Sequence, residues 1–155
     1  MQYFTLAALT TLIASAAALG KAVVKNNSQD TIYVWSVGAE ISEKQTVEPG
    51  KSWSEKLHSD PTAGGIAIKI TTKDDGIFNG APQQIFAYNL VDDAVWYDLS
   101  TVDGNPFEGQ HITVTNRRHE TIDWPQGTNP GGEFSQIKAG DREKNVVFLV
   151  GAGES

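Results

Sequence analysis

The stretch VWYDLSTVDGNPF, from Val95 to Phe107, joins a run of apolar and aromatic residues to an abrupt polar turn. The apolar run favours a strand, and Asp103-Gly104-Asn105-Pro106 is typical of a tight surface loop. Asp98 and Asp103 lie on either side of this junction and are the candidates for a carboxylate site. A plainer interpretation makes Asp103 a turn-stabilising residue and pairs Asp98 with a backbone amide. These residues alone favour the plainer interpretation.

The composition predicts one soluble, acidic domain. The chain has 155 residues, 39% of them hydrophobic, and its 19 acidic and 12 basic residues give a net charge of −7. Because the basic residues are scattered, nucleic acid and anionic membranes are disfavoured as partners. The same balance is compatible with a neutral polysaccharide.

The first twenty residues contain no charged side chain and resemble a secretory signal peptide. We expect cleavage after Ala18, which makes residues 1–18 the signal and 19–155 the domain; cleavage after Gly20 is the alternative. The apolar run is too short and too rich in Ala and Thr to favour a membrane span. We therefore expect a secreted protein, extracellular or associated with the cell wall.

Cysteine is absent from the whole sequence. The fold must therefore be stable without disulfides, which a chain of roughly 135 residues can achieve by burying enough apolar surface. The absence also excludes cysteine-ligated zinc, iron–sulfur clusters and cysteine nucleophiles. The three histidines show no metal-ligand spacing, and no phosphate-binding loop or serine nucleophile elbow occurs. We predict neither a metal nor a cofactor.

Short alternating segments predict an all-β fold. Ile66, Ile68 and Ile70 share one face of the clearest strand, and Ile112 and Val114 form another buried pair. Segments 22–25 and 31–37 are predicted to pair as a hairpin, as are the two segments that flank Asp92-Asp93. No segment has a convincing helical period. Eight or nine strands at this spacing indicate a β-sandwich, with Trp35 in its core and Trp124 and Phe134 anchoring a long loop.

The link between the first two predicted strands contains Asn26-Asn27-Ser28, an acceptor sequence for N-glycosylation. Such short matches are frequent by chance, and an asparagine at a strand end can be buried. Glycosylation of Asn26 is therefore an open alternative.

Several motifs resemble those of thaumatin-like proteins, notably KAVVKNNSQDTIYVWSVG, PGKSW and YDLSTVDGNPF. GGIAIKI, FAYNL, VWYDLSTVDGNPF and the late W-x-x-G-x-x-PGG are similar to a smaller fungal group, the secreted yeast-phase-specific family named for a Blastomyces protein. The resemblance covers nearly the whole chain after the signal. It implies a single thaumatin/osmotin-like β-sandwich domain without disulfides.

The resemblance also implies a site. Plant thaumatin-like proteins carry an acidic cleft linked with β-glucan binding and, in some members, weak β-1,3-glucanase activity. Asp98 and Asp103 match two of its aspartates, whereas Ala87 stands where the cleft has a glutamate. Lys69 and Thr71 lie where its arginine is expected.

Three functions follow as hypotheses. A non-catalytic binding module for β-glucan or another cell-wall polysaccharide leads, because hydrolysis needs a pair of carboxyl groups and Ala87 removes the usual partner. Tyr88, Trp96 and Tyr97 are the predicted aromatic contacts, since such rings stack on sugars. The alternatives are a weak endo-β-1,3-glucanase and a secreted effector that binds a host or microbial protein.

Overall fold

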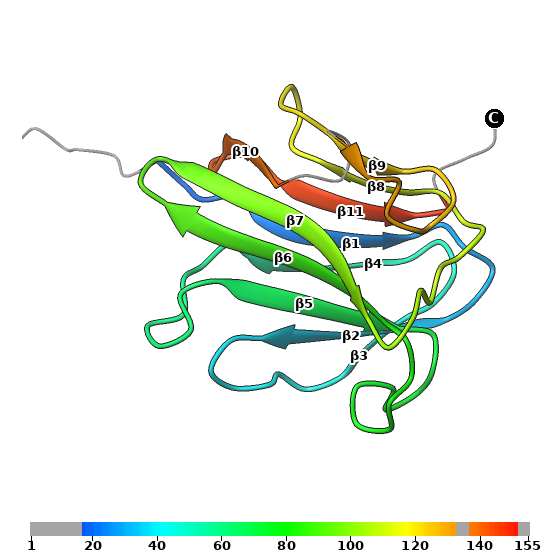
Figure 1. The fold of residues 1–155 in the computed structure, drawn as a ribbon. Helices are drawn as coiled ribbons and strands as arrows, with labels where there is room; N and C mark the ends of the chain where they lie inside the picture. The colour runs from blue at the N-terminus through cyan, green and yellow to red at the C-terminus, as the bar shows by residue number, and fades with distance from the viewer. Residues whose placement is uncertain (1–16, 133–136, 152–155) are drawn as a thin grey trace, which may run out of the picture.

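The computed structural model describes residues 17–132 and 137–151, and in these residues the chain forms two β-sheets that face one another (Figure 1). The described residues contain eleven strands and no α-helix, so the predicted all-β sandwich is confirmed. The strands are β1 (Lys21–Asn26), β2 (Ile32–Val37), β3 (Gln45–Val47), β4 (Ser52–Lys56), β5 (Ile66–Thr71), β6 (Gln83–Val91), β7 (Ala94–Val102), β8 (Ile112–Thr115), β9 (Ile122–Trp124), β10 (Lys138–Asp141) and β11 (Val146–Val150).

One sheet has five strands in the order β4-β1-β11-β8-β9, and the other has six in the order β10-β7-β6-β5-β2-β3. The parallel pair β1–β11 brings the two ends of the described chain together in the first sheet. The second sheet is built on the long β6–β7 hairpin, whose turn begins at Asp92 with a φ of 51°. The hairpin predicted on either side of Asp92-Asp93 is therefore confirmed.

The hairpin predicted from residues 22–37 is wrong. β1 lies in the five-stranded sheet and β2 in the six-stranded sheet, so the link between them crosses the sandwich. The buried side chain of Asn26 holds this crossing, because its Nδ2 donates hydrogen bonds to the carbonyls of Asp30 at 2.8 Å and Val47 at 3.0 Å. These bonds tie the end of β1 to β3 in the opposite sheet.

The core lies between the sheets and is made by alternate residues of each strand. Phe86 of β6 stacks on Phe148 of β11 across the interface, with ring centroids 6.1 Å apart. Along β11, Val146, Phe148 and Val150 are buried while the residues between them are partly exposed. β11 lies inside the five-stranded sheet and buries one face.

Trp35 is buried, as predicted, but on the outer face of the six-stranded sheet. Val34 belongs to the core between the sheets, so its neighbour Trp35 points the opposite way. There its ring meets Phe78 of the β5–β6 loop edge-on, at a centroid distance of 6.2 Å. Trp124 is buried in the core, and Phe134 lies outside the described residues.

The expected signal peptide lies outside the described residues except for Ala17 and Ala18. Leu19 packs against the core, and Gly20 donates a 2.8 Å hydrogen bond to the carbonyl of Arg142. Cleavage after Ala18 would keep both contacts, whereas cleavage after Gly20 would remove them. None of the described segments is a helix long and apolar enough to cross a membrane.

Candidate functional site: a groove on the six-stranded sheet

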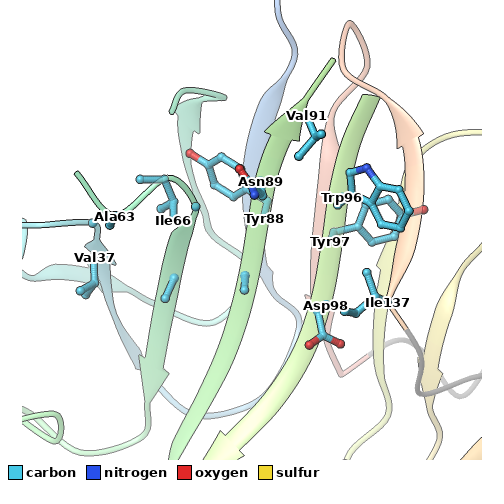
Figure 2. Close-up of a pocket in the computed structure, with 14 residues that line it drawn as sticks. Val37, Ala63, Ile66, Tyr88, Asn89, Val91, Trp96, Tyr97, Asp98 and Ile137 are labelled. Atoms are coloured by element: carbon cyan, nitrogen blue, oxygen red, sulfur yellow. The ribbon is translucent and has the colours of Figure 1, made fainter. Parts of the chain in front are cut away.

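The outer face of the six-stranded sheet carries an open groove with a volume of about 680 Å³. Ala67, Ala87 and Asp98 lie side by side across β5, β6 and β7 and form part of its floor. Because the two alanines are small, the floor is low at this row of residues. Figure 2 shows Val37 and Ala63 at one side of the groove and Trp96 and Ile137 at the other. The groove is thus a shallow, largely apolar trough across the strands.

Trp96 is the large aromatic side chain exposed in this groove. It is 44% exposed, and Val91 and Ile137 beside it are also exposed. The position follows from register, since Trp96 pairs with Ala139 of the edge strand β10 and Ile137 directly precedes that strand. An exposed indole flanked by aliphatic side chains can stack on the apolar face of a sugar ring.

Asp98 is the carboxylate of the groove. It is half-buried, and burial raises its pKa, an effect partly opposed by a hydrogen bond from the backbone N–H of Leu99. No ion pair found among residues 17–132 and 137–151 includes Asp98. Its oxygens are therefore available to accept hydrogen bonds from ligand hydroxyls.

Asp103 does not join Asp98 in the groove. It lies in the turn after β7, with a φ of 58°, and is absent from the groove lining. The strand from Asp98 to Val102 alone covers about 13 Å of extended chain. Glycosidases hold their two carboxyl groups roughly 5 to 9.5 Å apart. The two aspartates suggested by the resemblance are thus not placed as a catalytic pair.

Tyr88 and Tyr97, the other two predicted aromatic contacts, are among the residues that line the groove, but they expose very little of their surface. Both rings belong to the core and are nearly inaccessible, because they alternate with the outward-facing Ala87 and Asp98 on the same strands. The hydroxyl of Tyr97 donates a 2.5 Å hydrogen bond to the carbonyl of Glu120. Burial, and secondarily the charge of Glu120, raises the pKa of Tyr97 to about 12. These tyrosines support the groove from behind.

Among the described residues that line the groove, Asp98 is the one carboxylate, and the other residues singled out by the resemblance add none. Ala87 is the cross-strand partner of Asp98, so the missing glutamate would have stood directly beside it. Lys69 faces outward on β5 but does not line the groove, and Thr71 is fully buried.

A polar network was missed by sequence reasoning. Glu55 Oε1 accepts hydrogen bonds from Tyr88 at 2.8 Å and from Ser36 at 2.9 Å, and His58 Nδ1 lies 3.1 Å from the Tyr88 hydroxyl. Burial, followed by the nearby Glu55, raises the pKa of Tyr88. Glu55 and His58 lie close together in the sequence, whereas Ser36 and Tyr88 come from two other segments, so no single local motif contains the network. Ser36, Glu55 and His58 of this network also line a second cleft.

Asn26, the possible glycosylation site, is fully buried, and its burial disfavours a glycan in the folded protein. Its Oδ1 accepts hydrogen bonds from the backbone N–H and the hydroxyl of Ser28, in addition to the two bonds donated by Nδ2. A glycan on Nδ2 would replace one of its hydrogens and would have no space. The acceptor sequence here is a structural feature of the crossing.

Within the described parts of the chain no group of three or more histidine, aspartate or glutamate side chains is placed to hold a metal ion. His58 and His111 belong to separate regions of the molecule, each with its own partners.

A family model for the Blastomyces yeast-phase-specific protein, Bys1, matches residues 9–152. The chain belongs to the Bys1 family. This Bys1-family chain is 37% identical over 113 residues to an antigenic thaumatin-like protein of Arthroderma benhamiae, a match that covers 70% of this chain and 56% of that protein. It is 32% identical over 108 residues to the secreted thaumatin-like protein calA of Emericella nidulans, covering 66% and 60% respectively. The matches thus cover less than two thirds of the length of these relatives.

Solved structures confirm the fold. The protein elicitor MoHrip2 from Magnaporthe oryzae superposes with a TM-score of 0.69 at 21% identity, covering 86% of this chain and 99% of that one. The thaumatin-like xylanase inhibitor TLXI gives a TM-score of 0.54 at 9% identity, covering 83% and 97%. The expected thaumatin-like sandwich is therefore shown both by family and by structure.

Proposed function

We propose that this Bys1-family protein is a secreted, non-catalytic binding module that holds β-glucan of a cell wall weakly in the groove of the six-stranded sheet. The observation that carries the proposal is the combination, in one open trough, of the exposed indole of Trp96 and the half-buried carboxylate of Asp98. Secretion is supported by the N-terminal sequence and by a relative named as a secreted protein.

The chemistry of the groove suits a neutral sugar chain. Glucose units present apolar faces that stack on aromatic rings and hydroxyls that donate to carboxylates. Trp96 and Asp98 project from the same face of β7, two residues apart, so they are about 7 Å apart along the strand. That separation is close to the length of a sugar unit, which allows one short segment of chain to contact both.

Binding without hydrolysis is favoured by the number of carboxyl groups. An acid and a nucleophile or base must flank the scissile bond, whereas the described lining of the groove holds one carboxylate, Asp98, with Ala87 beside it. Asp103, the second candidate, lies beyond the end of β7. These placements support binding in preference to the weak glucanase alternative.

Retention on insoluble polysaccharide tests the proposal. The secreted protein is incubated with insoluble β-1,3-glucan and with chitin, and the bound fraction is compared among variants. Trp96→Ala and Asp98→Asn should reduce retention on glucan. The matched controls Phe78→Ala, which removes an exposed aromatic outside the groove, and Asp103→Asn, which removes the turn carboxylate, should bind as the unmodified protein does.

Two results would overturn the proposal in different ways. No retention on either polymer would exclude glycan binding and favour a protein partner for the exposed Trp96, Val91 and Ile137. Release of reducing sugar from laminarin that disappears in Asp98→Asn would show that the site is catalytic.

A further inference from the structure

We propose a second ligand site in this protein, a polar cleft that accepts a short neutral oligosaccharide or the end of a longer one. The cleft has a volume of about 680 Å³ and is formed by four loops, residues 27–30, 109–111, 125–126 and Gly151. It shares no lining residue with the groove that holds Trp96. The proposal therefore stands independently of the function proposed for that groove.

The first wall of the cleft is held rigid by the buried Asn26. The hydroxyl of Ser28 donates to Asn26 Oδ1 at 2.6 Å and lies 3.1 Å from the carbonyl of Asp30. Asn26 Nδ2 donates to that same carbonyl, so residues 26–30 form one closed hydrogen-bonded loop. A wall with this many internal bonds is already ordered before a ligand binds, which lowers the entropy cost of binding.

The opposite wall is fixed by backbone contacts between the other loops. Gly109 N–H donates to the carbonyl of Gln126 at 2.7 Å, and Gly151 N–H donates to the carbonyl of His111 at 3.0 Å. Gly127 lies at a φ of 68°, and a Cβ there would stand 1.8 Å from the carbonyl oxygen of Phe107. Only glycine permits the backbone of residue 127 to approach Phe107 this closely, so Gly127 is required for the loops around the cleft to pack as they do.

The side chains that line the cleft are mainly carboxamides. Each amide presents donors and an acceptor at fixed angles, which matches the paired donor and acceptor character of sugar hydroxyls. Four residues with such side chains, contributed by three of the loops, line the same cleft: Asn27, Gln29, Gln110 and Gln126.

His111 supplies a directed group within this lining. Its Nε2 is hydrogen-bonded to Asp123, which stands behind the lining and fixes the ring. With Nε2 as the donor in the neutral ring, Nδ1 is left as an acceptor for a ligand hydroxyl. Because its ring is already oriented, His111 loses little conformational freedom when a ligand binds.

The charge of the cleft selects for a neutral ligand. No lysine or arginine is among the described residues that line it, so a phosphate or sulfate finds no permanently charged cation there, and Asp30 is the one carboxylate of that lining. No cluster of three metal-ligating side chains exists among the described residues, which disfavours a divalent cation. A polyhydroxylated, uncharged molecule remains the ligand class that matches the lining.

An NMR titration of the folded ¹⁵N-labelled protein tests the inference, with laminaritriose, chitotriose and mannotriose as the probes. At least one sugar, at up to roughly 10 mM as suits a weak site, should shift the amide signals of Gly109, Gln126 and Gly151. The double variant Gln29→Ala/Gln126→Ala should weaken this binding about tenfold or more. Asn105→Ala, which removes an exposed amide outside the cleft, and Trp96→Ala should leave it unchanged.

The result that would overturn the inference is equally specific. The absence of shifts at these three amides with all three sugars would exclude the site, even where signals around Trp96 respond. Shifts caused by inorganic phosphate or Ca²⁺ but by none of the sugars would show that the ligand class is wrong. Retention of full affinity in the double variant would place the sugar elsewhere.

Discussion

Replacing Asn26 with alanine should destabilise the protein strongly, although the residue stands in a surface-type sequence motif. The side chain is fully buried and makes four hydrogen bonds, two donated by Nδ2 and two accepted by Oδ1. They connect the end of β1, the crossing loop and β3. Asn26 is therefore a link between the two sheets.

The expected loss follows from these bonds. A hydrogen bond contributes about 1 kcal/mol net, and a buried group left without a partner costs about 1–3 kcal/mol. Alanine would orphan the carbonyl of Val47 and the N–H of Ser28, so the free energy of unfolding should fall by about 4 kcal/mol. Since the free energy of unfolding of a whole domain is only about 5–15 kcal/mol, the variant should be only marginally stable.

Urea denaturation followed by tryptophan fluorescence measures this loss. With a slope of about 2 kcal/mol/M, the midpoint should drop by roughly 2 M. Asn27→Ala, at the exposed neighbouring position, is the matched control and should change the free energy of unfolding by less than about 0.5 kcal/mol. A loss in Asn26→Ala within about 1 kcal/mol of that control, or a glycan found on Asn26 in the folded secreted protein, would refute the reasoning.

Three further predictions concern the carboxylate of the groove and the tyrosine behind it. Because burial raises the folded-state pKa of Asp98, the contribution of this carboxyl group to stability is complete below its unfolded pKa near 4 and is lost as pH rises through the folded pKa. Asp98→Asn should therefore match the unmodified protein near pH 3 and be more stable than it near pH 7. A constant difference in urea midpoint between the two proteins across this range would contradict the prediction. The pKa of Tyr97 is raised from 10.0 to about 12, so its contribution to stability is complete below pH 10 and is lost as pH passes 12. Tyr97→Phe should therefore flatten the alkaline denaturation curve in this interval. An unchanged curve would show that another group controls the loss of stability at alkaline pH. Ala87→Glu should place a second carboxylate opposite Asp98 and, because the like charges repel, lower the free energy of unfolding near pH 7 by up to about 1 kcal/mol. The loss should be smaller near pH 3. Equal losses at both pH values would indicate a steric cause and contradict the prediction.

The sequence pattern was enough to predict which residues form the strands and which of them are buried together. Alternation correctly placed Ile66, Ile68 and Ile70 on one buried face, and Asp92-Asp93 correctly marked the turn between β6 and β7. It could not assign each strand to a sheet. A five-residue polar link such as 26–30 is compatible with a hairpin or with a crossing, and the difference here depends on the contact of Asn26 with the distant Val47.

Alternation also shows which residues share a face without showing which face is the core. Trp35 is buried by Phe78, a residue of a loop that is distant in sequence, so its apolar strand was no guide to its side of the sheet. For the site, the same rule could have been applied more strictly. Tyr97 and Asp98 are adjacent on a strand and point to opposite faces, so the side chain of Asp98 lies on the outer face and the ring of Tyr97 lies in the core.

The clefts outside the groove were beyond sequence reasoning. Glu55, His58 and Tyr88 meet across the edge of the sandwich, and His111 meets Asp123 across two strands. Each pairing depends on register and on sheet order, which single-sequence patterns do not contain. The fold family could be inferred from motifs, whereas the arrangement of these polar groups required coordinates.

Affinity for soluble β-1,3-glucan oligomers, measured by calorimetry on the folded protein and on Trp96→Ala, addresses the groove most directly. If the groove holds glucan through the exposed indole, the unmodified protein should bind with a Kd of about 1 mM. The Kd of Trp96→Ala should be at least about tenfold higher. Equal affinity in the two proteins would contradict a glucan site in the groove of the six-stranded sheet.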